Sequence, residues 1–410
     1  MAPLVGLRGL AALWIVTYHI QCMTINLHGD YGKMFPFFLE GSQMFSIFFI
    51  LSGLSLVAFY DEKKLSSWTK IRFFWSKRVA RLAPLYYLGL LLAIPGAVRA
   101  YKNVHSSPGS ITAESLLNAL FLKSIFWPSR TNGFVNWEVQ LWQISAFMGC
   151  YCLYPLLIKF RGSRTEHAII ATLLYVFPVI CYFVLAEACE SLSDQEMVNK
   201  STPYEWLQGI HYWYIPRLPQ FILGIYLGNF LFKTSYLLPS SLAAVISDAS
   251  LLTIASVTIL LAYHEDRIFL WERFFQFLLV PVHILLIMAL CHEEEHRQRR
   301  RGCGWRSISS LLFNSKPLQK LGELSLAMYC LHVQLFNPYI MLLEYPKIYQ
   351  HWDRWHYWVP VNLVLPYICV LIVVSAFVIQ VYEEPLRTCL ARWLAVGRNN
   401  KWDKEPRRVK

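Results

Sequence analysis

A single histidine in this 410-residue chain has the type and position for acid–base chemistry. His19 lies in the segment WIVTYHIQCM, residues 14–23, within the first long apolar stretch. A neutral imidazole can take a proton from a hydroxyl group at pH 7. A polar ring in an apolar segment must face protein or a water-filled cavity, so His19 is either a general base or a buried ring that hydrogen-bonds a neighbouring helix. His283 and His332 also fall in apolar stretches, so the residue type alone does not decide between these roles.

A pair of arginines at the start of a later apolar stretch is the second candidate. Arg78 and Arg81 lie in SKRVARLAPLYYL, residues 76–88. Residues three apart share a face of a helix, so the two guanidinium groups can bind phosphate oxygens with paired hydrogen bonds. The alternative is ordinary anchoring, because basic residues gather at the cytoplasmic ends of membrane helices.

Composition and hydropathy predict that these residues lie in a bundle of membrane helices. The chain is 56% hydrophobic and 16% charged, whereas soluble domains carry about 25% charged residues. Small residues at Gly41, Ser52 and Gly53, and the pair Gly224 and Gly228, favour close packing of helices. Segments of about 20 apolar residues, enough to cross about 30 Å of hydrocarbon, recur along the chain. We predict an all-α transmembrane bundle with ten spans, at residues 5–25, 41–60, 82–99, 139–158, 168–187, 214–232, 243–263, 273–291, 321–343 and 359–382.

The distribution of Lys and Arg predicts the topology of this bundle. Segments rich in these residues fall on one side of a ten-span arrangement, and the connections on the other side are poor in them. By the positive-inside rule, both termini are cytoplasmic. Asn199 begins an N-x-S sequon on the predicted outer side and is a candidate glycosylation site. We expect a multi-pass protein of an endomembrane, such as the endoplasmic reticulum, or of the plasma membrane. The basic segments are 61–81, 159–164, 292–320 and the tail after residue 386.

Charge and cysteine patterns argue against other classes of protein. The formal net charge is +12, but the basic residues lie between the apolar segments, so we expect no nucleic-acid partner. The ten cysteines include no C-x-x-C pair, and we expect neither a metal site nor a bound cofactor. No repeat of about 20–50 residues and no inverted duplication is visible, which weakens the case for a transporter.

Seven motifs, in chain order, resemble those of the acyltransferase 3 family of integral-membrane acyltransferases. The resemblance covers almost the whole chain and implies a membrane domain at residues 1–386, followed by a basic cytoplasmic tail at 387–410. It also implies transfer of an acyl group, often acetyl, from cytoplasmic acyl-CoA to a hydroxyl of a small metabolite, a lipid or a sugar, with acyl-CoA as co-substrate. The motifs are GLRGLAALWIVTYH (6–19), FFILSG (48–53), RVARLAPLYY (78–87), LWQISAFMGCYCLYPLL (141–157), RLPQFILGIYLG (217–228), LGELSLAMYCLH (321–332) and YEEPLR (382–387).

The resemblance assigns roles to individual residues. His19 matches the histidine of the first helix, which the family uses for catalysis, and Arg78 with Arg81 matches its R-x-x-R motif on the donor side. Direct transfer with His19 as general base and transfer through an acyl-histidine both remain open. Four more residues match family motifs and either contact the acceptor or have structural roles, namely Trp142, Arg217, Tyr329 and His332.

Two positions depart from the family pattern. When Trp142 and Pro155 are aligned with the family, Phe147 stands where a glutamate is common, and Ser46 stands where many members carry aspartate. Glu138 is nine residues before Phe147 and about half a rotation away, so it does not replace the missing acid. The absent acids leave open a transporter, a silent protein, or a family member that catalyses a reaction other than transfer.

Overall fold

Helices form every regular element that the computed structural model describes, so the predicted all-α class is confirmed. Each of the ten predicted spans overlaps one of these helices. The described residues are 2–22, 41–60, 63–103, 115–124, 139–159, 164–192, 213–233, 238–263, 274–299, 306–342 and 363–394. The principal helices are α1 (Ala2–Cys22), α4 (Met44–Phe59), α5 (Trp68–Asn103), α7 (Trp142–Leu157), α8 (Arg164–Glu190), α11 (Leu218–Lys233), α12 (Ser240–Tyr263), α14 (Val280–Arg299), α15 (Ile308–Phe313), α16 (Lys316–Leu342), α17 (Val364–Val378) and α18 (Glu384–Leu394), and the π-helix η7 (Ile379–Glu383) joins the last two.

Six helical segments of the described chain are long and apolar enough to cross a membrane, and α4 is a shorter apolar helix. α7 and α11 have 16 residues each, which gives about 24 Å at 1.5 Å per residue, less than the hydrocarbon thickness. The number of crossings and the cytoplasmic location of the termini therefore stay predictions. The six segments are Ala2–Ile20, Trp68–Pro95, Thr165–Glu190, Ser240–Leu261, Phe274–Arg299 and Val364–Leu394.

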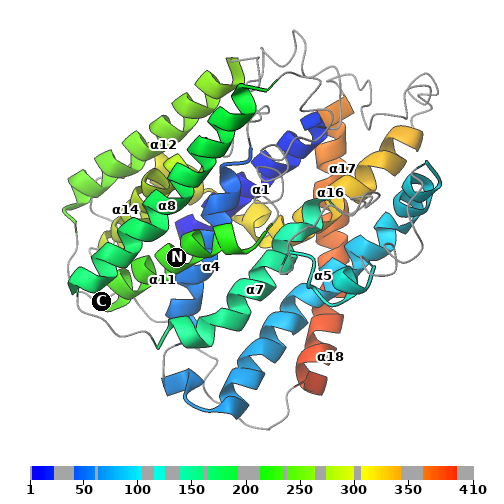
Figure 1. Ribbon diagram of the computed structural model, residues 1–410, viewed down its shortest axis with the longest axis horizontal. Coiled ribbons are helices and arrows are strands. Elements are labelled where there is room, and N and C mark those ends of the chain that lie inside the picture. The colour runs from blue at the N-terminus through cyan, green and yellow to red at the C-terminus, as the bar shows by residue number, and fades with distance from the viewer. Residues whose placement is uncertain are drawn as a thin grey trace.

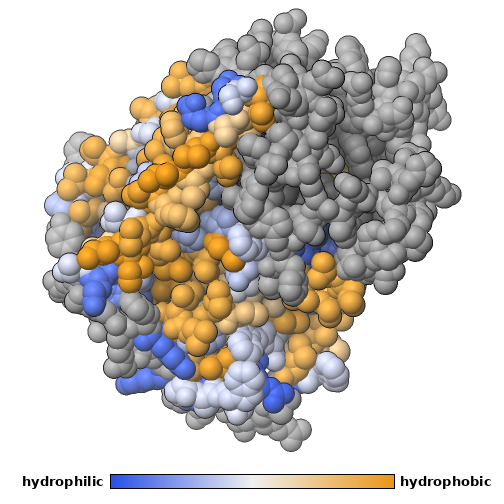
Figure 2. All heavy atoms as spheres, viewed as in Figure 1, coloured by the Kyte–Doolittle hydropathy of each residue, from blue (hydrophilic) through white to orange (hydrophobic). Residues whose placement is uncertain are grey.

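The outer surface of the bundle is apolar, as a protein in lipid requires. On α8, one exposed face carries Ile169, Leu173, Phe177, Ile180 and Val184, at the spacing of three and four residues that places side chains on one side of a helix. Figure 2 shows hydrophobic residues covering much of the described surface on this side of the molecule. An apolar surface that covers much of one side of the molecule fits contact with acyl chains rather than with water.

Helix α1 lies inside the bundle and packs most extensively on α16. Figure 1 shows α1 between α8 and α12 on one side and α16 and α17 on the other. The backbones of α1 and α16 approach closely at two glycines, because a Cβ atom on Gly9 would lie 2.7 Å from the Gly322 nitrogen. The absence of side chains at this point allows the two helices to touch.

A second close approach joins α4 to α11. A Cβ atom on Gly53 would lie 2.1 Å from the Phe221 oxygen, and one on Gly224 would lie 2.2 Å from the Ile50 oxygen. The prediction that small residues at 53 and 224 permit close helix packing is confirmed. These contacts fix α4 beside α11 in the interior, where α4 also contacts α1.

Two helices extend beyond the predicted spans. The third span was expected to start at residue 82, and α5 begins earlier, at Trp68, so the helix that carries Arg78 and Arg81 starts ten residues before Arg78. The hydropathy pattern missed this part because its charged residues lower the mean hydropathy, although Lys77, Arg78 and Arg81 line a cavity described below. The last helix also continues beyond 382 through η7 and α18 to Leu394, so the first part of the predicted tail is helical. Asn199 lies outside the described residues.

Candidate active site

A cavity of about 460 Å³ lies among α1, α4, α5, α7 and α16. Among the described residues that line it, four are cationic, Arg8 from α1 and Lys77, Arg78 and Arg81 from α5, and none carries a carboxylate. Arg81 is exposed, and Arg8 and Arg78 are half-buried, and all three line the cavity. A concentration of positive charge between low-dielectric walls attracts an anion.

Aromatic rings hold Arg78 in the wall of this cavity. Its guanidinium carbon lies 5.5 Å from the centre of the Tyr60 ring and 5.7 Å from that of Phe74. Its Nη2 donates to the Tyr60 hydroxyl at 3.4 Å, and its buried Nε has no hydrogen-bond partner among the described residues. The rings thus orient a guanidinium group that lines the cavity, and such a group can bind an anionic ligand.

Arg8 and Arg81 add to this charge from two different helices. The two guanidinium groups lie close enough to repel one another, and Arg78 also repels Arg81. Glu383 attracts Arg81, but its carboxylate forms an ion pair with Arg387 at 2.9 Å and does not line the cavity. In the described part of the chain, no ion pair neutralises Arg8, Arg78 or Arg81, so an anionic ligand would relieve their mutual repulsion.

The rest of the cavity wall is mainly apolar. Phe147 lines it and contacts the rings of Phe49, at 4.5 Å, and Tyr151, at 6.1 Å. The Tyr151 hydroxyl forms a hydrogen bond of 2.8 Å with Ser52, which also lines the cavity. At position 147, an aromatic stack therefore takes the place of the glutamate common in the family.

Ser46, the second departure from the family pattern, takes part in a buried polar network. Its hydroxyl donates to the backbone oxygen of Gln276 at 3.2 Å and accepts from the side chain of Gln220 at 3.0 Å. These three residues are buried, and Ser46 does not line the cavity. In this chain, position 46 connects α4 to α11 and to the segment before α14.

Two of the sequence-predicted residues form a hydrogen-bonded pair. His19 of α1 and His332 of α16 are joined through Nδ1 of His19 and Nε2 of His332, at 2.9 Å, and their ring centres lie 4.9 Å apart. His332 is fully buried and His19 is half-buried. Among the described residues, no carboxylate forms a hydrogen bond with either ring.

The packing of α1 on α16 explains why these two histidines meet. His19 follows Gly9 by ten residues, and His332 follows Gly322 by ten residues. On both helices the histidine comes after the glycine in the chain, and each of these two residues of α1 contacts its counterpart on α16, so the two helices are parallel. Ten residues correspond to about 15 Å along each helix axis. The equal interval of ten residues on each helix thus brings His19 and His332 to the same level.

Tyr329 connects the histidine pair to the cavity. It lines the cavity, its ring centre lies 5.9 Å from that of His332, and its hydroxyl donates to the backbone oxygen of Gln140. Arg8 lies on the same helix as His19 and eleven residues before it, which corresponds to about 16 Å along the axis. The same helix therefore places Arg8 at the cavity and His19 in the histidine pair.

Trp142 and Arg217 lie together beside the histidines and do not line the cavity. The buried guanidinium of Arg217 lies 5.4 Å from the Trp142 ring and 5.5 Å from the Phe277 ring. Phe45 contacts both the Trp142 ring, at 5.5 Å, and the His19 ring, at 6.0 Å. Cation–π contacts thus stabilise the charge of Arg217 in this apolar environment.

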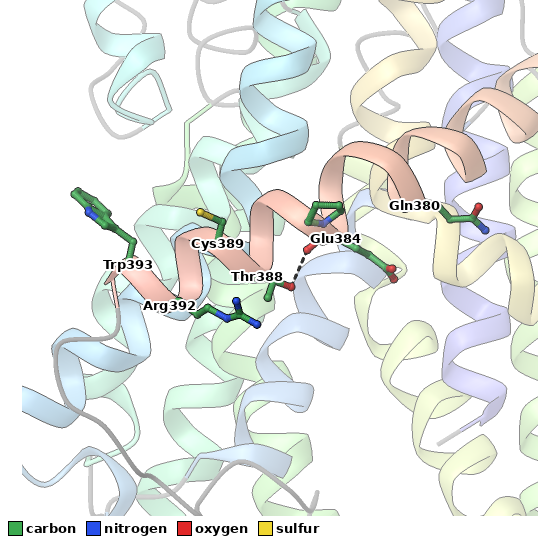
Figure 3. A pocket seen from close by; sticks show the side chains of 7 residues that line it. Gln380, Glu384, Thr388, Cys389, Arg392 and Trp393 are labelled. Carbon is green, nitrogen blue, oxygen red and sulfur yellow. Dashed lines mark hydrogen bonds between the residues drawn. The ribbon is translucent and has the colours of Figure 1, made fainter.

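A second hollow, of about 660 Å³, lies along η7 and α18 and differs in kind from the cavity. Its lining residues all come from one continuous helical segment, and Figure 3 shows their side chains spread along that segment from Gln380 to Trp393. Trp393 is 77% exposed. Among the described residues, no other element contributes to its lining, so the hollow is an open groove along this segment.

The sequence reasoning missed several residues of the cavity, above all Arg8 and Lys77. Arg8 gave a usable signal, because a cation within an apolar span must face protein or a polar cavity. Lys77 was predicted to belong to the basic segment 61–81, before the third span. In the described residues, no group of three or more His, Cys, Asp and Glu side chains could hold a metal ion.

Comparison with protein families gives one match, to the model described as an acyltransferase domain (Acyl_transf_3), over residues 4–385. The match covers nearly the whole chain and includes the cavity and the histidine pair. Searches of curated proteins and of solved structures found no match.

Proposed function

The chain belongs to the acyltransferase 3 family and is a membrane acyltransferase, and from this premise we propose that it transfers an acyl group from acyl-CoA to a hydroxyl of a small metabolite, lipid or sugar. Acetyl is the acyl group that we expect. The observation that carries the proposal is the cavity, whose described lining residues include four cations and no carboxylate. The histidines do not line it, but Tyr329 does, and its ring centre lies 5.9 Å from that of His332. This arrangement suits a donor with phosphates at one end and a reactive thioester at the other.

The cations suit the donor because coenzyme A carries phosphate groups. Arg8, Arg78 and Arg81 can form paired, charge-assisted hydrogen bonds with phosphate oxygens, and Lys77 supplies a further positive charge. The apolar wall around Phe147 and Tyr151 suits the less polar arm of the donor. The thioester would then extend from the cations toward His19, along the direction of α1.

His19 supplies the base for the transfer step. Its imidazole takes the proton of the acceptor hydroxyl while the hydroxyl oxygen attacks the thioester carbonyl carbon. The new carbon–oxygen bond forms, the carbon–sulfur bond breaks, and the coenzyme A sulfur leaves as a thiolate that takes the proton back from the imidazolium. General base assistance contributes about 10²- to 10⁴-fold to the rate.

Label transfer with the His19→Ala variant tests this role. Membranes with the wild-type or variant protein are incubated with labelled acetyl-CoA and an extract of the host's metabolites, and the labelled products are identified. We expect the wild-type protein to label a hydroxyl compound and His19→Ala to lose at least about a hundredfold of that rate. Full turnover by a folded, inserted variant would contradict the assigned role.

Binding measurements test the donor site independently of the acceptor. Each lost charge-assisted hydrogen bond costs about 1.5–3 kcal/mol, so replacing Arg78 and Arg81 together by glutamine should weaken acetyl-CoA binding by about a hundredfold or more. Arg72→Gln is the matched control, because Arg72 lies on the same helix but does not line the cavity. Unchanged affinity in the double variant would mean that the arginines only anchor α5.

A phosphate-free acetyl thioester separates charge recognition from general damage to the protein. The two arginine substitutions should weaken turnover of acetyl-CoA while leaving turnover of this small thioester nearly unchanged. Equal losses with both donors would contradict a phosphate-binding role.

A further inference from the structure

We infer that His332 is a positioning residue that fixes which nitrogen of His19 can act as the base. The inference rests on the proposed function and deepens it. His332 accepts a hydrogen bond from the Nδ1–H group of His19, and the proton stays on His19. The lone pair of His19 Nε2 is then free to receive the proton of the acceptor hydroxyl. The observation behind it is the chain of hydrogen bonds that runs from a backbone carbonyl through His332 to His19.

The backbone of α16 determines the tautomer of His332. Its Nδ1 lies 2.8 Å from the Tyr329 oxygen and 3.2 Å from the Met328 oxygen. Carbonyl oxygens accept but do not donate hydrogen bonds, so Nδ1 of the neutral ring must carry the proton. Nε2 of His332 then has a lone pair and can only accept.

This tautomer of His332 determines that of His19. The contact between the rings is 2.9 Å from His332 Nε2 to His19 Nδ1, and a hydrogen bond at this distance needs one proton. Since His332 Nε2 accepts, His19 Nδ1 donates. Its Nε2 then keeps the lone pair.

Burial gives the two rings different tasks. His332 is fully buried, and the Tyr367 hydroxyl donates to its backbone oxygen, so its position is fixed from both sides. His19 is half-buried and is therefore the more exposed of the two residues. A catalytic histidine needs a third group that holds the correct tautomer, and in hydrolytic triads this group is a carboxylate. In this chain, a neutral imidazole takes that place beside His19.

Nitrogen-15 NMR of protein labelled at histidine tests the inference without any acceptor. A protonated ring nitrogen and one with a lone pair differ strongly in chemical shift, and the His19→Ala spectrum identifies the signals of His19. We expect a proton on Nδ1 and a lone pair on Nε2 in the wild-type protein. A proton on Nε2 of wild-type His19 would overturn the inference, whether or not the protein transfers acyl groups.

Two variants of His332 provide the kinetic test. The amide oxygen of His332→Gln reaches the place of Nε2 and can accept from His19, whereas the shorter His332→Asn reaches only the place of Nδ1. We expect His332→Gln to keep kcat within about tenfold of the wild-type value. His332→Asn should lower kcat by about tenfold to a thousandfold, less than the full value of base assistance, and leave KM for acetyl-CoA unchanged.

The same pair of variants separates positioning from packing. Both remove the ring and change the volume of one buried site, so a purely structural role predicts similar losses for both. Equal kcat in His332→Asn and wild type, or equal losses in the two variants, would overturn the inference. A wild-type protein that binds acetyl-CoA but transfers nothing would contradict the proposed function alone, and the NMR result would still decide the tautomer.

Discussion

Replacing Gly9 by alanine should separate the two histidines, although Gly9 contacts neither of them. The added Cβ atom would lie 2.3 Å from the Leu318 oxygen and 2.7 Å from the Gly322 nitrogen. Ordinary contacts begin at 3.4 Å, so α1 and α16 must move apart by about 1 Å, because backbone atoms cannot rotate away as a side chain can.

This displacement is large compared with the tolerance of the hydrogen bond. The bond between His19 and His332 is 2.9 Å long, and a separation of about 1 Å lengthens it to about 4 Å, beyond hydrogen-bonding distance. Without the acceptor, the His19 proton distributes between both nitrogens, and kcat should fall by about tenfold to a thousandfold, as in His332→Asn. Overpacking should also cost about 1–3 kcal/mol of stability.

Label transfer, thermal unfolding and the histidine spectrum together measure this effect. Gly228→Ala is the control, because it adds the same methyl group to the α4–α11 contact, where the nearest atom is the Val57 Cβ at 3.0 Å. The control should lose some stability and keep its His19 tautomer and its kcat. A folded Gly9→Ala protein with wild-type kcat and an unchanged His19 signal would refute the link between helix contact and catalysis.

Two further predictions concern the cavity. Arg8→Gln should weaken acetyl-CoA binding by about tenfold or more and leave the phosphate-free thioester unaffected, since one charged hydrogen bond is worth about 1.5–3 kcal/mol; equal affinity by calorimetry would place Arg8 outside the donor site. Phe147→Glu should restore the carboxylate common in the family but weaken acetyl-CoA binding by about tenfold, because the new charge lies in a wall shared with four cations and competes with phosphate. Phe147→Leu keeps the wall apolar and should bind normally, and tighter binding by Phe147→Glu would contradict this argument.

The positions of the helices could be predicted from the sequence more accurately than the residues at which they begin and end. Apolar stretches of membrane length are visible in any hydropathy profile, and each predicted span overlaps a helix. The start of α5 was missed because a profile averages over all faces of a helix. Arg78 and Arg81 lower that average, although they face a cavity and not lipid.

The sequence also pointed to the main residues of the site but not to their arrangement. His19, Arg78 and Arg81 could be selected because polar groups are costly in apolar segments. The contact between His19 and His332 could not be predicted, because 313 residues separate them and hydropathy does not specify which helices touch. The contact between Gly9 and Gly322 pairs α1 with α16. The sequence shows both glycines but does not show that they contact one another.

In the mechanism that we propose, helix α1 explains why the lack of a carboxylate at position 147 is compatible with His19 as the base. One end of α1 supplies Arg8 to the cavity, and the other end presents His19 about 16 Å further along the axis. A carboxylate at position 147 would lie in the wall shared with the cations, where it would lower the positive potential that a phosphate requires. The orienting group of His19 comes instead from α16, which holds His332 on the other side of Tyr329. Recognition of the donor and orientation of the base thus depend on separate groups, and the charge of one does not disturb the other.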